Sequence, residues 1–238
     1  METAQREMSF LLAGPERRAL RWIAEQLPRS WMPDHLTVIG VLGALTVATG
    51  YVLSARHPGW LWLASLGLLV NWFGDSLDGT LARVRKIERP KYGYYLDHMV
   101  DAITTALIGA GIGLSPFVDL PIALVVVILY LTLSINVYLE SAVFGVFDLG
   151  FGVFGPTEAR LLLVLANAGL YAGAVWMGLS SASVARVANV VIALACVVMG
   201  YAILARLRIN LIRLARLEPP RRRASEAAPP SYTPPNQG

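Results

Sequence analysis

The chain has 238 residues, of which 55% are hydrophobic and 15% are charged, and its mean hydropathy is +0.55. Soluble domains carry about 25% charged residues, so this composition excludes an ordinary soluble domain and indicates a polytopic membrane protein. The formal net charge is +4, and the basic residues gather at the two ends and in segment 83–91. This distribution favours a lipid bilayer over nucleic acid as the partner. The single cysteine, Cys196, excludes an intrachain disulfide framework.

The N-terminal segment, residues 1–34, contains an amphipathic pattern over residues 15–27. Its apolar positions are Leu20, Trp22, Ile23 and Leu27, and charged residues such as Glu16 lie between and before them. The pattern predicts a helix that lies flat at the membrane interface, with an ordinary soluble helix as the alternative. Pro33 then breaks the chain before the first long apolar run.

Six apolar runs follow, each close to the ~20 residues that cross a bilayer. They predict an all-α fold with six transmembrane helices in a catalytic domain over residues 35–210. We expect the spans at 35–54, 60–82, 92–114, 120–144, 157–179 and 184–207. The remaining segment, 211–238, is basic and rich in proline, which predicts a disordered tail.

The charges predict how this bundle is oriented in the membrane. With six spans, 18 of the 20 lysines and arginines fall on one side, and Arg56 and Arg186 fall on the other. Cytoplasmic loops carry the excess of basic residues, so both termini and the end of the second span are expected in the cytoplasm.

Four carboxylates interrupt the second and third apolar runs: Asp75, Asp78, Asp97 and Asp101. An ionised carboxylate costs ~2.5–3.5 kcal/mol at the bilayer centre, which indicates a functional use. The first two are three residues apart and the last two are four apart, so each pair lies on one face of a helix. Two helices that meet along these faces would bring four anions together, and divalent metal is the simplest relief. Oxygen ligands favour Mg²⁺ or Mn²⁺ over zinc.

Small residues accompany the acids, and Gly79, Ala82 and Gly93 would allow a ligand to approach the backbone closely. The full pattern is D-x-x-D-G-x-x-A-R, nine residues, then G-x-x-x-D-x-x-x-D, from Asp75 to Asp101. It resembles the signature of the CDP-alcohol phosphotransferases, and all eight fixed positions are present. Residues 33–37, Pro-Asp-His-Leu-Thr, are similar to the family's Pro-Asn-x-Leu-Thr, with Asp34 in place of asparagine.

The resemblance implies an enzyme of phospholipid synthesis that transfers a substituted phosphate group from a CDP-alcohol to an acceptor hydroxyl, releasing CMP. It implies two Mg²⁺ or Mn²⁺ ions held by the four aspartates, with Asp101 also a candidate general base. By the same resemblance the CDP site comprises Thr37, Gly79, Ala82, Arg83 and Gly93. Homodimers are common in the family, and the sequence itself does not indicate one.

The donor and acceptor stay open at this point. Asp97-His98-Met99-Val100-Asp101 resembles the Asp-His-x-x-Asp of choline and ethanolamine phosphotransferases, which use a CDP-headgroup and diacylglycerol. That subgroup implies His98 as the base, and the alternative is a helix histidine that hydrogen-bonds a neighbour. Glu140 and Glu158 are expected either to bind the acceptor or headgroup, or to cap helices or pair with Arg160.

The other donor is CDP-diacylglycerol, with a soluble polar alcohol such as glycerol phosphate, serine or inositol phosphate as acceptor. Two remote alternatives belong to other classes. A transporter would place its acids near the middle of the membrane, whereas these cluster at one face. A non-catalytic scaffold of the same fold would not require the complete set of aspartates.

Overall fold

A computed structural model describes residues 13–144 and 155–218, in which every regular element is a helix and no strand occurs. The elements are α1 (Ala13–Gln26), α2 (Pro33–Leu53), the short 3-10 helix η1 (Pro58–Trp60), α3 (Leu61–Arg85), α4 (Pro90–Gly113), α5 (Leu120–Phe144), α6 (Pro156–Val175) and α7 (Ser181–Leu217). The prediction of an all-α fold is confirmed for the described residues. Segments 1–12, 145–154 and 219–238, which include most of the expected tail, lie outside them.

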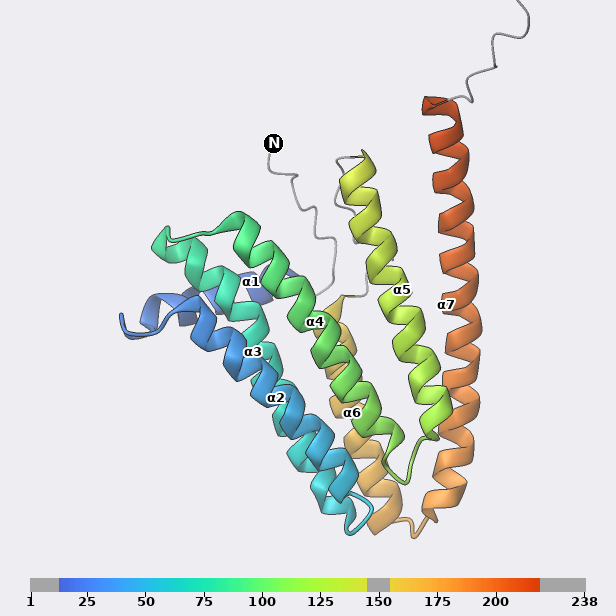
Figure 1. Cartoon of the computed structure of the whole chain (residues 1–238). Coiled ribbons are helices and arrows are strands. Elements are labelled where there is room, and N and C mark those ends of the chain that lie inside the picture. Colours follow the sequence, from blue (N-terminus) through green and yellow to red (C-terminus); the bar gives the residue numbers. More distant parts are fainter. Residues whose placement is uncertain (1–12, 145–154, 219–238) are drawn as a thin grey trace, which may run out of the picture.

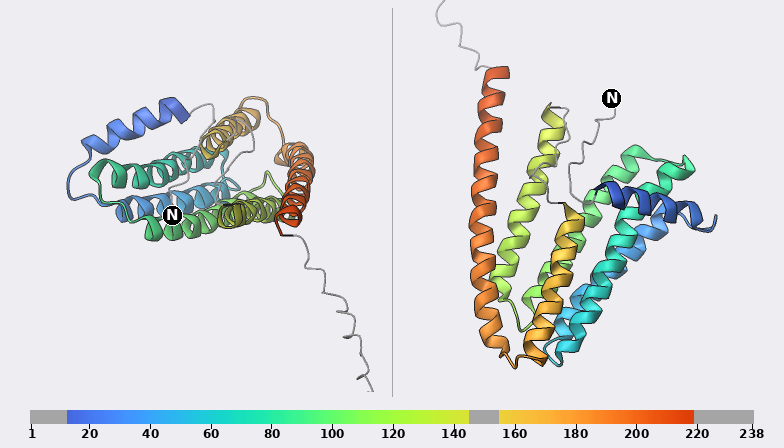
Figure 2. Two further views of the ribbon diagram at one scale, coloured as in Figure 1. Left: turned by 90° about the horizontal axis from the view of Figure 1, so that it is seen from above. Right: turned by 180° about the vertical axis from the view of Figure 1, so that it is seen from behind.

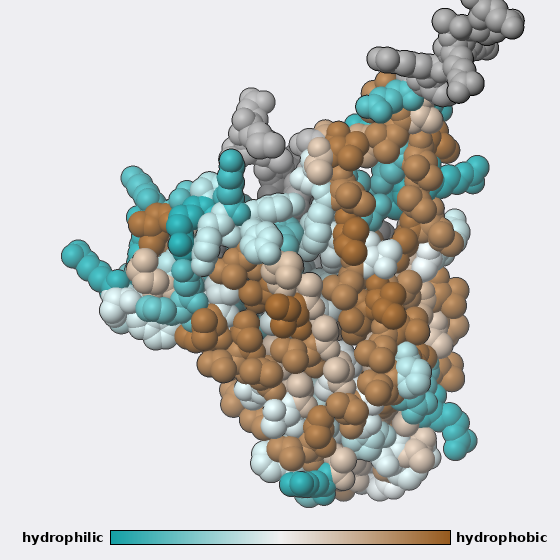
Figure 3. All heavy atoms as spheres, in the orientation of Figure 1, coloured by the Kyte–Doolittle hydropathy of each residue, from teal (hydrophilic) through white to brown (hydrophobic). Residues whose placement is uncertain are grey.

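Helices α2 to α7 run alternately up and down, so the end of α3 and the starts of α4 and α6 lie toward one end of the bundle (Figure 1). Helix α1 lies crosswise to the others at that end (Figure 2). Hydrophilic residues gather over this end and in a smaller group at the opposite one, with a hydrophobic surface between them (Figure 3). This distribution is that of an integral membrane protein.

Four helices, α2, α5, α6 and α7, are long and apolar enough to cross a membrane by length and composition. The other two predicted spans, α3 and α4, have 25 and 24 residues and are long enough, but their aspartates make them more polar. The ends of the last two helices differ from the expectation. Helix α6 ends at Val175, and α7 continues to Leu217, into the segment that its composition assigned to the tail.

Helix α1 packs against the bundle by part of its apolar face. Leu20 and Ala24 are buried in one core with Leu36 of α2 and with Leu77 and Leu81 of α3. Trp22 of the same helix is 65% exposed. The apolar positions of α1 are therefore divided between the protein and its surroundings.

Glycines set the distance between α2 and α3. A Cβ atom on Gly67 of α3 would lie 2.6 Å from the Val47 backbone nitrogen and 2.9 Å from the Gly43 carbonyl oxygen of α2. Added Cβ atoms on Gly43 and Gly74 would also overlap the backbone of the opposite helix. Small residues allow this close approach in membrane bundles. The first turn of α2 is thereby placed against the signature segment of α3.

A buried polar group holds α6 against both helices. The Tyr51 hydroxyl of α2 donates to the Asn167 side-chain oxygen of α6 at 2.8 Å. The Asn167 amide nitrogen donates to the Ser65 hydroxyl of α3 at 3.1 Å. Each polar atom named here has a partner, which is the condition for burying such groups in a membrane protein.

The glycine contact predicts the effect of one added methyl group. Gly67→Ala should lower the free energy of unfolding by about 1–3 kcal/mol, because neither backbone can retreat without moving a whole helix. Thermal unfolding in detergent measures this effect. Gly169→Ala in α6 is the matched control, since a Cβ there meets nothing within 4 Å. Equal stability of the two variants would contradict the prediction.

Candidate active site

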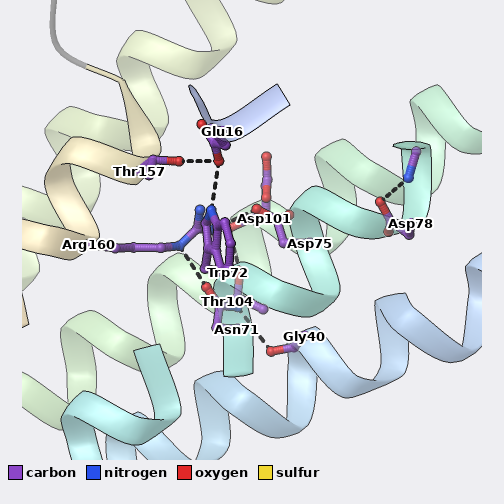
Figure 4. Close-up of polar contacts among 11 residues, drawn as sticks. Glu16, Gly40, Asn71, Trp72, Asp75, Asp78, Asp101, Thr104, Thr157 and Arg160 are labelled. Atoms are coloured by element: carbon purple, nitrogen blue, oxygen red, sulfur yellow. Dashed lines mark hydrogen bonds and ion pairs between the residues drawn. The ribbon is translucent and has the colours of Figure 1, made fainter. Parts of the chain in front are cut away.

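Three of the four predicted metal ligands come together between α3 and α4. Asp75, Asp97 and Asp101 each offer a carboxylate oxygen, and these atoms lie within 4.8 Å of one another. Asp75 and Asp101 point toward each other from α3 and α4 (Figure 4). All three side chains remain partly accessible, and that of Asp97 is 48% exposed. Three of the four acids singled out by their spacing thus lie close enough to share one ion.

Asp78 differs from the expected arrangement, because it is not a member of this group. Its carboxylate accepts hydrogen bonds from the Thr37 hydroxyl at 2.7 Å and from the Gly79 amide at 2.6 Å. Figure 4 shows Asp78 displaced along α3 from Asp75 and Asp101. Thr37, Asp75, Asp78 and Asp97 nevertheless line one small cavity. The close packing of α2 explains the difference, since it supplies the hydroxyl that binds Asp78.

The acid group fits a hard divalent cation. Its donors are carboxylate oxygens, the type that Mg²⁺ and Mn²⁺ prefer, and no histidine or cysteine belongs to the group. Three carboxylates this close repel one another, and a bound cation would relieve that repulsion. The residues present thus meet the chemical requirement for such an ion.

Arg160 reaches the acid group from α6, a contact that sequence reasoning did not predict. Its guanidinium donates to Asp75 at 2.6 Å and to the Asn71 side-chain oxygen at 3.0 Å. The Asn71 amide nitrogen donates in turn to the Gly40 carbonyl at 3.0 Å. The chain of contacts joins α6, α3 and α2 directly behind the carboxylates (Figure 4). The sequence signal for this contact was a single arginine, Arg160, at the start of an apolar run, since a charge in such a run usually has a partner.

The residues expected at the CDP moiety occupy the end of the bundle that carries the acids. Arg83 lies beside Gly79, since a Cβ there would be 3.4 Å from the guanidinium, which also donates to the Thr80 hydroxyl at 3.2 Å. Ala82 is partly exposed one residue before Arg83. Gly93 is exposed at the start of α4, with nothing within 4 Å of an added Cβ.

His98 is held by its neighbours on α4 and α5. Its Nδ1 lies 2.6 Å from the Tyr94 carbonyl oxygen. Its ring lies 4.1 Å from the ring of Tyr94 and 4.2 Å from that of Tyr138, measured between centroids. The residues that line the cavity beside the acids do not include His98. This placement matches the alternative of a helix histidine bonded to a neighbour.

Glu140 and Glu158 also have structural partners. Glu140 of α5 forms an ion pair with Arg206 of α7 and accepts a hydrogen bond from Asn136 at 2.7 Å. Glu158 accepts from the Gly155 amide at 3.0 Å, which caps the start of α6. The Glu158 contact is thus a helix cap and the Glu140 contact is an ion pair, while Arg160 contacts Asp75.

The fold and the site define an integral membrane protein with an acidic group at the junction of α3 and α4, beside the Asp75–Asp101 signature. The family model for CDP-alcohol phosphatidyltransferase matches residues 30–201. The chain therefore belongs to the CDP-alcohol phosphatidyltransferase family, which is a family of enzymes, and the resemblance seen in the signature is confirmed.

A relative of known name is similar to part of this chain. Over 94 residues the chain is 37% identical to the phosphatidylinositol phosphate synthase of Cutibacterium acnes (strain DSM 16379 / KPA171202). The match covers 39% of this chain and 42% of that relative, so it spans less than half of either protein.

The acid group predicts a loss of metal binding in Asp97→Asn. Mutation of a residue that only orients a metal ligand typically lowers metal affinity about 10–100-fold. Removing the charge of a ligand itself should therefore weaken Mn²⁺ binding by at least about tenfold. Titration of the purified protein, with free Mn²⁺ followed by electron paramagnetic resonance, measures the affinity. Asp119→Asn, at an exposed aspartate before α5, is the control. Unchanged affinity in Asp97→Asn would contradict the assignment.

Proposed function

We propose that this protein transfers a substituted phosphate group from a CDP-alcohol to an acceptor hydroxyl and releases CMP, in phospholipid synthesis. The main observation is the group formed by Asp75, Asp97 and Asp101, whose oxygens lie within 4.8 Å of one another. Its place within the signature of a CDP-alcohol phosphatidyltransferase family member supports the same reaction. A transporter or a scaffold would not require this combination.

The acids hold the divalent ions in this proposal. Asp75, Asp97 and Asp101 supply ligand oxygens. Asp78 supplies a fourth carboxylate next to this group, and the Thr37 hydroxyl orients the Asp78 carboxylate. Bound there, one or two Mg²⁺ or Mn²⁺ ions would neutralise the charge of the donor pyrophosphate and polarise its phosphorus.

The other signature residues bind and orient the donor. Arg83 is permanently charged and its guanidinium can donate two hydrogen bonds to a phosphate, while Gly79, Ala82 and Gly93 leave room beside the backbone. Asp101 accepts the proton of the acceptor hydroxyl as that oxygen bonds to phosphorus. The bond between this phosphorus and the phosphate oxygen of CMP then breaks, and CMP leaves with that oxygen.

CDP-diacylglycerol is the proposed donor, and a phosphorylated polyol is the proposed acceptor. The relative from Cutibacterium acnes is a phosphatidylinositol phosphate synthase, which supports this pair. The contacts of His98 with Tyr94 and Tyr138 also weaken the reason to choose a CDP-headgroup donor. The choline and ethanolamine alternative keeps the motif around His98 as its support.

The orientation is also part of the proposal. Helices α3 and α4 cross the membrane with the four apolar ones, α1 lies at the interface, and both termini are cytoplasmic. The excess of lysine and arginine near the acid-bearing end supports this direction. The soluble part of the donor and a phosphorylated acceptor would then reach the site from the cytoplasm.

A donor screen tests the reaction. Purified protein in lipid nanodiscs with Mg²⁺ or Mn²⁺ should release CMP from CDP-diacylglycerol when inositol phosphate is added. CDP-choline or CDP-ethanolamine with diacylglycerol should release little. Asp97→Asn is the inactive control. CMP release with the CDP-headgroups alone would overturn the proposed donor, and no release with any pair would overturn the reaction class.

A pair of variants separates the two candidate bases. Asp101→Asn should lower kcat by at least about 10²-fold, because it removes both a ligand and the proposed proton acceptor. His98→Gln should lower kcat by less than about tenfold, since the general-base contribution of about 10²–10⁴-fold is assigned elsewhere. Steady-state CMP release measures both. A larger loss in His98→Gln than in Asp101→Asn would return the role to His98.

A further inference from the structure

Glu16 joins three helices next to the acid group. The sequence counts this residue among the charged positions of the amphipathic segment, and in the structure it is half-buried. Its Oε1 accepts a hydrogen bond from the Trp72 indole nitrogen of α3 at 2.7 Å and another from the Thr157 hydroxyl of α6 at 2.7 Å. Figure 4 shows Glu16 reaching in from α1 above both residues.

The Glu16 contact and the Arg160–Asp75 ion pair are consecutive links across one interface. Trp72 and Asp75 are three residues apart on α3, and Thr157 and Arg160 are three residues apart on α6, so each pair shares a helix face. Glu16 therefore fixes the spacing of α6 from α3 one turn away from the point where Arg160 contacts Asp75. The next polar link along α6 is Asn167, seven residues further on.

Helix α1 is anchored independently, so Glu16 is presented from a fixed position. Leu20 and Ala24 are buried against α2 and α3. The chain after α1 is held by Arg85, which donates to the carbonyls of Leu27 at 3.0 Å and Pro28 at 2.8 Å. A carboxylate on a fixed helix can set the distance between two others, whereas one on a mobile helix could not.

We propose that Glu16 is a positioning residue, which holds the start of α6 against α3 so that Arg160 stays on Asp75. This inference rests on the proposed function, since it assigns Asp75 to the metal site. Both donors to Glu16 are neutral groups, so the acceptor oxygen matters rather than the negative charge. Glutamine keeps that oxygen, and alanine removes it.

The experiment compares Glu16→Ala, Glu16→Gln and Glu25→Ala. Glu25 is the matched control, because it lies on the same helix and pairs with the exposed Arg21. Hydrogen exchange of the amides of residues 160–166 reports how firmly α6 is held, and a Mn²⁺ titration reports the site. Neither readout requires turnover, and CMP release then gives kcat and KM.

Glu16→Ala should speed exchange in 160–166 by at least about tenfold and weaken Mn²⁺ binding by about tenfold, as for other groups that orient a ligand. Its kcat should fall more than its KM for the donor rises. The exchange rate and Mn²⁺ affinity of Glu16→Gln should stay within about threefold of the wild-type values. Those of Glu25→Ala should equal the wild-type values. If Glu16→Ala does not fold, Thr157→Val removes the α6 hydroxyl alone and should give the same direction of change.

Wild-type exchange and Mn²⁺ affinity in Glu16→Ala would overturn the inference. A Glu16→Gln variant as defective as Glu16→Ala would overturn the role of the acceptor oxygen. Wild-type protein that releases no CMP, but whose variants show the expected exchange and Mn²⁺ changes, would overturn the proposed function and leave the positioning role intact.

Discussion

Repulsion between closely placed carboxylates is the constraint around which this end of the molecule is built. Two unit charges about 5 Å apart repel by about 3 kcal/mol at an effective dielectric constant of about 20, and Asp75, Asp97 and Asp101 form three such pairs. A membrane protein tolerates this arrangement only with compensating groups. Arg160 contacts one of these carboxylates, Asp75, directly. A divalent cation bound by the carboxylate oxygens would neutralise the rest of the negative charge.

The rest of the bundle keeps these charges in place through contacts of two kinds. Glycines bring α2 and α3 so close that a Cβ on Gly67 would lie 2.6 Å from the Val47 backbone. Polar side chains then set the register, as Asn71 does by joining Arg160 to the Gly40 carbonyl. Apolar packing in lipid is weakly directional, so directional hydrogen bonds and steric fit decide which faces meet.

The same contacts separate groups that look alike in the sequence. Asp75 and Asp78 are three residues apart on one helix face, but Arg160 binds the first and Thr37 binds the second. Glu140 pairs with Arg206 of α7, Glu158 accepts from the Gly155 amide at the start of its own helix, and the acid group includes neither. The partner of each carboxylate, rather than its residue type, therefore distinguishes these acids.

The sequence by itself determined the helical architecture, the helix boundaries to within a few residues for most elements, and the family, because apolar run length and the spacing from Asp75 to Asp101 are local properties. It also determined that Asp97 and Asp101 would share a face with each other, since a four-residue spacing fixes this in any helix. Only the tertiary structure decided that Asp78 binds Thr37, that Arg160 reaches Asp75, and that Glu16 joins α1 to α3 and α6. Those contacts join residues 41 to 141 positions apart and depend on the depth and rotation at which helices pack, which periodicity along one helix does not encode.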